Sequence, residues 1–176
     1  AWSQNAEPNL MNREGLPAAA FNTHWPKDPT LGKRVSDGKP HQSSHPNTHG
    51  RDSGLTDGQW GAANPVCYAT SEADGFPKHA TIDLGAAQPL HAVIYGTPAI
   101  GATKTVAVSI SEDGKTFTEV GRHDFPVKQA GRAEARFAPK PARYVRVSFL
   151  GNHAQQDNFN ANFGFLAEVE AYSPER

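Results

Sequence analysis

From residue 79 to the end of the chain, apolar and polar residues alternate with a period of two in short segments that Gly and Pro residues separate. The segments read HATIDLG, LHAVIYG, TKTVAVSIS, TFTEVG, RAEARFA, ARYVRVSFL and FGFLAEVEAY. Successive side chains of a β-strand point to opposite faces, so each segment is predicted to be a strand with one buried face. No helical period interrupts the series. The pattern therefore predicts an all-β chain folded as an antiparallel β-sandwich.

The same alternation predicts which side chains face the core. They are Ala80, Ile82 and Leu84; Val106, Val108 and Ile110; Val145, Val147 and Phe149; and Phe165, Ala167, Val169 and Ala171. In the closing strand, Glu168 and Glu170 alternate with these apolar residues and are expected to face outward. Asp113 and Gly114 are the Asp-Gly pair typical of a two-residue turn, which predicts a β-hairpin on either side of them.

The beginning of the chain lacks this pattern. Residues 1–30 hold several prolines and show neither a helical nor a strand period, which predicts an extended arm. The β domain is expected to occupy residues 31–176. The sequence therefore predicts two parts of very different character.

Three histidines lie in the polar, turn-rich connection at residues 31–53. His41, His45 and His49 are four residues apart, a spacing that would align three metal ligands on a helix. Prolines and a glycine interrupt that helix, so we expect loop histidines near the surface. The alternative is a sugar-binding role for one of them, because a neutral imidazole donates to or accepts from a hydroxyl group.

Composition narrows the classes of function. A formal net charge of −1 over 176 residues argues against a nucleic-acid binder that works through a positive field. No apolar run approaches the ~20 residues that span a bilayer, and no signal peptide is recognisable. The chain starts at Ala1, which suggests a mature or excised fragment. The single Cys67 allows no internal disulfide and is expected to be a small buried residue rather than a nucleophile.

Two carboxylates stand at opposite ends of the β domain. Asp57 lies in the Gly-containing segment GLTDGQW before the first alternating strand, and Glu168 lies in the last strand. Hard cations such as Ca²⁺ prefer oxygen ligands, and an irregular Gly-rich loop can turn several carbonyls toward one. These residues predict a cation that ties the two ends together. The alternative is an Asx turn at Asp57 with Glu168 facing solvent.

Five phrases occur in the order seen in one known family: GLTDGQW, ATIDLGAAQPLHAVIYG, VSISEDGKTFTEVG, ARYVRVSFLG and FLAEVEAY. Over roughly residues 31–173 the chain resembles the coagulation factor V/VIII type C, or discoidin-like, domain. It is similar to the bacterial modules of carbohydrate-binding module family 32. The resemblance implies a jelly-roll β-sandwich with the galactose-binding-domain topology. It also implies binding of glycans, or of membrane and protein surfaces, without catalysis.

The resemblance further implies a structural Ca²⁺ ion. Side-chain oxygens would come from Asp57 and Glu168, and backbone carbonyls from Gly54, Gln59 and Ala167. The family usually adds a Ser or Thr shortly after the Asp-Gly turn. The sequence GQWGAANPV has none at that point, so one ligand of the family pattern is missing.

For the ligand, the resemblance implies loops at one end of the sandwich that combine an aromatic platform with Arg, Asn or His. Many members carry an Arg after the strand that matches LHAVIYG, where this chain has Gly96, Thr97 and Pro98. The candidate ligand-binding residues that remain are His49, Arg51, Trp60, Asn152, His153, Asn158, Phe159, Asn160 and Phe163. The alternative is a solvated late loop with Phe163 or Phe165 filling the core.

The arm has a resemblance of its own. The run AW…N…NL.N.EGLPA..F.T is similar to the final segment of bacterial sialate O-acetylesterases, although Asn22 and His24 depart from that pattern. The nucleophilic Ser and catalytic His of such an enzyme lie outside this sequence. We therefore expect a non-catalytic module of a secreted, extracellular or periplasmic, carbohydrate esterase. Its partners would be glycans containing galactose, N-acetylgalactosamine or sialic acid; the alternative is a structural domain that docks on the esterase.

Overall fold

A computed structural model of the chain describes residues 28–60 and 67–175. Residues 1–27, most of the predicted arm, therefore lie outside the described residues. The elements are a 3₁₀ helix at Pro29–Leu31, β1 (Lys33–Arg34), β2 (His41–Ser43), β3 (Tyr68–Ala69), β4 (Lys78–Thr97), β5 (Thr103–Ser111), β6 (Thr118–Asp124), β7 (Gly131–Asn152), β8 (Phe165–Leu166) and β9 (Glu168–Ser173). Every strand pairing is antiparallel, which confirms the predicted all-β class. In residues 28–60 and 67–175, no helix is long and apolar enough to cross a membrane.

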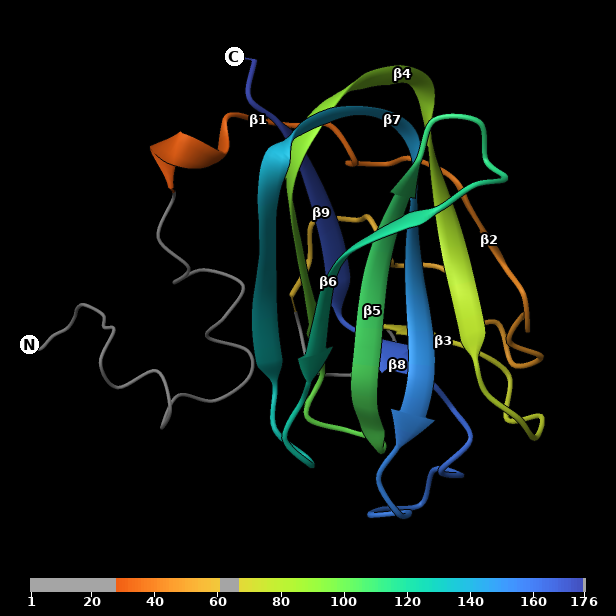
Figure 1. The fold of residues 1–176 in the computed structure, drawn as a ribbon. Coiled ribbons are helices and arrows are strands. Elements are labelled where there is room, and N and C mark those ends of the chain that lie inside the picture. The colour runs from red at the N-terminus through yellow and green to blue at the C-terminus, as the bar shows by residue number, and fades with distance from the viewer. Residues whose placement is uncertain (1–27, 61–66, 176) are drawn as a thin grey trace, which may run out of the picture.

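Strands β4 and β7 are long, and they bend over one end of the molecule (Figure 1). The first half of β4 pairs with the second half of β7, and the second half of β4 pairs with the first half of β7. Each strand therefore contributes to both layers of the sandwich. Four separate strands were predicted here, and this count is wrong because the pairing continues through the bend. Pro89 faces Pro141 at that point. Because proline has no N–H group, neither residue leaves a backbone donor unpaired there.

The two layers close around one apolar core. One layer consists of β2, β5 and β6 with the adjoining halves of β4 and β7; the other consists of β1 and β9 with the remaining halves. A small separate sheet pairs β3 with β8. The predicted core positions on β4, β5 and β7 are all buried and belong to the main cluster, which confirms their assignment. The β5–β6 hairpin is also confirmed, but its predicted two-residue turn is wrong, because the pairing ends at Ile110 and Thr118 and a longer loop joins the strands. In that loop Asp113 Oδ1 accepts hydrogen bonds from the N–H groups of Lys115 (2.8 Å) and Thr116 (2.9 Å).

Strand β9 departs from its predicted pattern. Val169 and Ala171 lie in the main core, but Glu168 and Glu170, which were expected to face solvent, are 0% and 4% exposed. The expectation is wrong because alternation identifies the opposite face of a strand without showing whether that face is covered. Here that face carries a second apolar cluster, made of Leu31, Trp60, Ala92, Ile94 and Ala167, and the Gly58 N–H and the Trp60 indole contact the two glutamates. Ala167 and Phe165 are buried as expected, although outside the main cluster.

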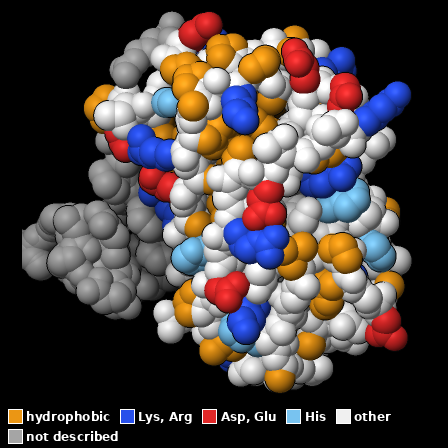
Figure 2. Space-filling view, viewed as in Figure 1, with side chains coloured by type: hydrophobic (Ala, Val, Ile, Leu, Met, Phe, Trp, Pro, Cys, Tyr) orange, Lys and Arg blue, Asp and Glu red, His pale blue; other side chains and the backbone are white. Residues whose placement is uncertain are grey.

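Charged side chains of both signs are interspersed over the face seen in Figure 2. No broad positive surface, of the kind that attracts a phosphate backbone, is visible on that face. The described termini, Asp28 and Glu175, lie near the end at which β4 and β7 bend, whereas β3, β8 and the loop after β7 lie at the opposite end (Figure 1).

Candidate functional site

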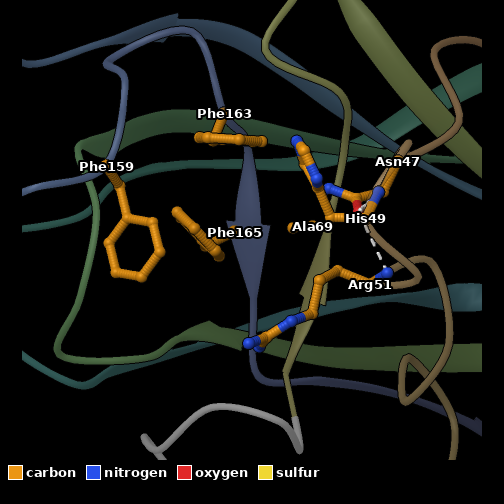
Figure 3. Close-up of a pocket in the computed structure, with 7 residues that line it drawn as sticks. All are labelled: Asn47, His49, Arg51, Ala69, Phe159, Phe163 and Phe165. Carbon is orange, nitrogen blue, oxygen red and sulfur yellow. Dashed lines mark hydrogen bonds between the residues drawn. The ribbon is translucent and has the colours of Figure 1, made fainter.

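A cavity of about 260 Å³ opens beside the small β3–β8 sheet, at the end of the sandwich away from the described termini. Three segments that are distant in the sequence line it: the loop after β2, strand β3, and the loop that runs from β7 into β8 (Figure 3). The lining residues are Asn47, His49, Arg51, Ala69, Phe159, Phe163 and Phe165. One wall is aromatic and the other carries nitrogen atoms.

The aromatic wall consists of three phenylalanine rings that pack against one another. The ring centroids of Phe159 and Phe165 are 5.1 Å apart at 70°, and those of Phe159 and Phe163 are 6.3 Å apart at 84°. Edge-to-face contacts of this kind are the favoured geometry of aromatic pairs. Gly101 lies directly against the ring of Phe165, where an added Cβ would collide with Cδ2. The backbone therefore closes tightly behind the wall and holds it in place.

The polar wall is organised by Asn47, which is 8% exposed. Its Oδ1 accepts hydrogen bonds from the backbone N–H groups of His49 (2.8 Å) and Arg51 (3.0 Å), and its Nδ2 donates to the Thr70 carbonyl at 2.7 Å. Asn side chains commonly stabilise tight polar loops by accepting hydrogen bonds from backbone N–H groups that follow them in the chain. It presents His49 and Arg51 toward the cavity (Figure 3).

The two side chains of this wall differ in their surroundings. His49 Nε2 lies 3.4 Å from Glu72 Oε1; the His49 side chain is largely in solvent, whereas Glu72 is partly buried. The Arg51 guanidinium extends below the ring of Phe165 (Figure 3). Within residues 28–60 and 67–175, it makes no hydrogen bond or ion pair. It is therefore the polar group of the cavity most available to a ligand.

The loop between β7 and β8 is held by its own polar side chains. Asn152 Nδ2 donates to the carbonyls of Ala161 and Phe163, each at 2.7 Å. Asp157 accepts hydrogen bonds from the N–H groups of Phe159 (2.9 Å) and Gly101 (2.8 Å). These contacts fix both ends of the aromatic wall, so the loop is pre-organised rather than loosely solvated.

A buried lysine links this loop to the segment before β4. Lys78 is 0% exposed, and its Nζ donates to the carbonyls of Ser71 at 2.9 Å and Asn162 at 2.5 Å. Its ammonium group also lies 5.1 Å from the centre of the Phe76 ring. Burial lowers the pKa of Lys78, because desolvation disfavours the charged form, and the nearby Asp74 and Glu72 oppose that shift. Nothing in the sequence pattern marks Lys78, because it stands where a strand begins.

The structure separates the sequence-predicted ligand residues into groups. His49, Arg51, Phe159 and Phe163 meet in the cavity, and Asn47, Ala69 and Phe165 join them. Phe165 had been considered only as a core residue; it is buried and also lines the cavity. The Asn47-Thr-His-Gly turn composition is the signal that could have identified Asn47.

The other predicted residues have different surroundings. Asn152 holds the loop as described, and His153 Nε2 lies 2.9 Å from the Phe125 carbonyl. Asn158 and Asn160 are exposed, and Asn160 Oδ1 accepts from the N–H of Asn162 at 2.8 Å. Trp60 does not line the cavity: it is buried in the second cluster, and its Nε1 donates to Glu170 Oε2 at 2.9 Å.

A second group of predicted residues surrounds Glu168 on β9. Glu168 Oε2 accepts a hydrogen bond from the Gly58 N–H at 2.5 Å. Its Oε1 is buried and has no hydrogen-bond partner among the described residues. Burial raises the pKa of Glu168 to about 10, and the negative charges of Asp57, Glu170 and Asp37 add to the shift. A buried carboxylate oxygen without a partner is costly unless another group compensates it.

The loop that carries Asp57 lies along β9. The Val169 N–H donates to the Leu55 carbonyl at 2.9 Å, and the Gly38 N–H donates to the Thr56 carbonyl at 2.8 Å. Asp57 Oδ1 accepts a hydrogen bond from the Gln59 N–H at 3.0 Å, so the Asx turn of the alternative prediction is present. The other half of that prediction, that Glu168 faces solvent, is wrong because Glu168 is buried.

The donor set near Glu168 suits a hard cation. Within the described ranges, no three His, Cys, Asp or Glu side chains converge as a metal centre, so any cation here depends on backbone carbonyls. Ca²⁺ accepts such a mixture of carboxylate and carbonyl oxygens. The unpartnered Glu168 Oε1, the nearby charge of Asp57 and the Gly-rich loop are the features that fit it.

Solved structures share this fold. A family 32 carbohydrate-binding module of Clostridium perfringens, CpGH89CBM32-5, in complex with GalNAc-β-1,3-galactose, has a TM-score of 0.63 at 16% identity; the match covers 80% of this chain and 100% of that one. The family 32 module of C. perfringens NanJ in complex with galactose has a TM-score of 0.60 at 15% identity, over 80% and 98%. The module of AlyQ in complex with 4,5-unsaturated mannuronic acid has a TM-score of 0.60 at 17% identity, over 80% and 98%.

At these identities the structural likeness shows the fold, and it confirms the predicted jelly-roll sandwich of the discoidin-like type. A comparison with curated protein sequences finds no match. The family model described as the F5/8 type C domain matches residues 40–164, a span that contains both the cavity-lining loops and the paired halves of β4 and β7. The chain belongs to the F5/8 type C domain family.

Proposed function

We propose that this domain binds glycans, without catalysing a reaction on them, through the cavity lined by the three phenylalanines and Arg51. The observation that carries the proposal is the meeting of an aromatic wall with an available guanidinium at the loop end of a discoidin-like sandwich. Aromatic rings pack on the apolar parts of a sugar, and Arg N–H groups donate to its oxygens. The glycan complexes of the structurally similar modules support the same assignment.

The position of the cavity supports a targeting role. The chain enters the sandwich at Asp28, which accepts a hydrogen bond from Nη2 of Arg136 on β7 at 2.5 Å. Leu31, which follows shortly after, is buried. His91 Nε2 contacts the Leu31 carbonyl at 2.6 Å. The entry is therefore anchored at the end away from the cavity (Figure 1). A preceding catalytic domain would leave the cavity open to glycans.

The preceding unit that we propose is a secreted carbohydrate esterase of the sialate O-acetylesterase type, acting outside the cell or in the periplasm. The support is the resemblance of the arm sequence, which lies outside the described residues. The second candidate function is structural docking on that esterase. The anchored entry at Asp28 favours it, since a segment fixed to the sandwich would hold the two domains in one orientation.

We further propose a structural Ca²⁺ ion beside Glu168. Asp57 and Glu168 would supply side-chain oxygens, and Gly54, Gln59 and Ala167 would supply carbonyls. The ion would neutralise the buried carboxylate and tie the Asp57 loop to β9. The support is the unpartnered Oε1 of Glu168 and the raised pKa of its carboxyl group.

Affinity electrophoresis tests the glycan-binding function. A single shallow module is expected to bind with a Kd on the order of 0.1–1 mM, so a gel that contains a multivalent mucin amplifies a weak interaction. The wild-type chain should migrate more slowly with mucin than without it. Arg51→Gln should restore the mobility, whereas Arg122→Gln, an exposed arginine of β6, should not. Equal mobility in both gels, or equal retardation of Arg51→Gln, would contradict the proposal.

A further inference from the structure

The hydrogen-bonding groups of the cavity are unbalanced. None of the lining side chains is an Asp or Glu, and Asn47 Oδ1 already accepts two backbone hydrogen bonds. Two nearby carboxylates lie outside the lining: Glu72 contacts His49 through Oε1 while its buried Oε2 has no partner among the described residues, and Asp157 accepts from two backbone N–H groups. On the donor side, Arg51 offers a guanidinium with five N–H groups. Among its side chains, the polar wall is rich in donors and poor in acceptors.

This imbalance discriminates between classes of sugar. The hydroxyl groups of a neutral sugar both donate and accept, so a donor-rich wall leaves their protons without partners. A carboxylate only accepts, and its two oxygens match the planar fork of a guanidinium in a bidentate pair. The polar wall therefore favours an anionic sugar over a neutral one.

The aromatic wall adds a second requirement. Its rings meet at 70° and 84°, so they form an apolar corner rather than one flat platform for a pyranose face. Ala69 adds a further apolar residue to the lining. A corner of this shape suits a small apolar substituent, such as the methyl of an acylamino group.

We infer that the cavity selects an acidic, N-acylated sugar, of which N-acetylneuraminic acid is the type. The carboxylate pairs with Arg51, and the acyl methyl group lies against Phe159, Phe163 and Phe165. This inference rests on the proposed glycan-binding function and specifies its ligand. Both recognition elements lie in one cavity, with the Arg51 guanidinium reaching below the Phe165 ring (Figure 3).

A set of four sugars separates the two elements. All four are used as methyl glycosides. Galactose carries neither group, N-acetylgalactosamine carries only the acyl group, and galacturonic acid carries only the carboxylate. N-acetylneuraminic acid carries both groups. Isothermal titration of the intact chain should give the tightest binding for N-acetylneuraminic acid, at least tenfold tighter than for galactose. The methyl ester of N-acetylneuraminic acid, which lacks the charge, should lose most of that advantage.

Two variants assign the elements to their walls. Arg51→Gln should abolish the difference between N-acetylneuraminic acid and its ester while the preference for the acyl group persists. Phe159→Ala should reduce the acyl preference and leave the charge preference. Arg122→Gln is the matched control for a lost guanidinium.

The outcomes distinguish this inference from the function on which it rests. If galactose binds as tightly as N-acetylneuraminic acid and the binding depends on Arg51, the selectivity is wrong and the glycan-binding function stands. If a sulfated galactose binds as tightly as N-acetylneuraminic acid, the cavity selects an anion and the N-acyl requirement is wrong. If none of the sugars binds, both proposals fall.

Discussion

Two regions of the molecule hold polar groups in opposite ways. Beside Glu168, the fold buries a carboxylate, surrounds it with the charges of Asp57, Glu170 and Asp37, and leaves one oxygen without a partner. Around the cavity, Asn47 and Asp157 satisfy the backbone of the loops, and the guanidinium of Arg51 is left available. The first region buries a carboxylate whose charge is uncompensated, whereas the second holds its aromatic and polar walls in place before a ligand arrives. Changes in the first should therefore alter stability, and changes in the second should alter binding.

The largest expected effect is a pH-dependent response to Ca²⁺. In the calcium-free chain, the folded state keeps Glu168 protonated up to a pKa of about 10, whereas the unfolded state ionises above its ordinary value of 4.5. The folded state thus binds more protons, so the free energy of unfolding falls as pH rises between these values, by up to about 1.4 kcal/mol per pH unit. Bound Ca²⁺ would keep the carboxylate of the folded state ionised, as it already is in the unfolded state above its ordinary pKa, and should remove the slope.

Urea unfolding at pH 5 and pH 8, with chelator and with Ca²⁺, measures this response. The stabilisation by Ca²⁺ should be small at pH 5 and about 4 kcal/mol at pH 8. Glu168→Gln is the matched control, because it keeps the shape without a titrating group, and it should show neither the slope nor the Ca²⁺ response. A wild-type chain whose stability ignores Ca²⁺ at pH 8 would remove the cation from this account.

Replacing the buried lysine should have the next largest effect. Lys78→Met removes the donor that joins the carbonyls of Ser71 and Asn162, of which Ser71 keeps the Thr70 hydroxyl as a donor, and it should lower the free energy of unfolding by about 2–4 kcal/mol. Chemical denaturation measures it, with Lys115→Met, an exposed lysine, as the control that should change little. A loss below about 0.5 kcal/mol would show that Lys78 does not hold the two segments together.

A smaller loss of stability is expected where the backbone at Gly101 contacts the aromatic wall. In Gly101→Ala, the added Cβ collides with the Phe165 ring at a residue whose φ of +79° already disfavours alanine. We expect a loss of about 2 kcal/mol in stability and about tenfold in glycan affinity. Gly75→Ala is the matched control: its φ is +101° with open space around it, so it should lose stability without losing affinity. Equal affinity losses in the two variants would separate Gly101 from the cavity.

The smallest expected change in stability comes from the exposed part of the cavity. Phe159→Ala should cost only about 1 kcal/mol in unfolding free energy, because the ring is half-buried, while glycan affinity falls about tenfold. Phe117, half-buried under the Arg146 guanidinium at 3.8 Å, provides the control. Phe117→Ala should lose similar stability with unchanged affinity. An intact affinity in Phe159→Ala would show that the aromatic wall does not contact the ligand.

The sequence predicted the sandwich because each strand reports its own buried face. Ile82, Val108 and Val147 are buried as their alternation indicates. The same rule failed at Glu168 and Glu170, because the groups that cover them come from residues more than 100 positions earlier in the chain. A period-2 pattern contains no information about what packs on the opposite face.

The cavity could be predicted only in part, for a similar reason. His49, Arg51, Phe159 and Phe163 stood out by residue type in loops. Lys78 was missed because its hydrogen bonds reach backbone groups of other segments, whereas Asn47 was missed although the turn composition of its own loop marks it. Trp60 stood out by type as well, but its indole is buried beside Glu170. Residue type indicates what a side chain is able to do, and tertiary contacts decide where it does it.

A residue-resolved NMR titration of the intact chain with N-acetylneuraminic acid, N-acetylgalactosamine and galactose tests most directly whether the cavity binds glycans. We expect amide shifts to concentrate at residues 47–51, at Ala69 and at residues 159–165, which border the cavity. The amides of Gly58 and Val169, beside Glu168, should stay unchanged at constant Ca²⁺. Shifts that centre on the Glu168 region or on the outer face of β5 and β6, or no shifts with any of the three sugars, would contradict this expectation.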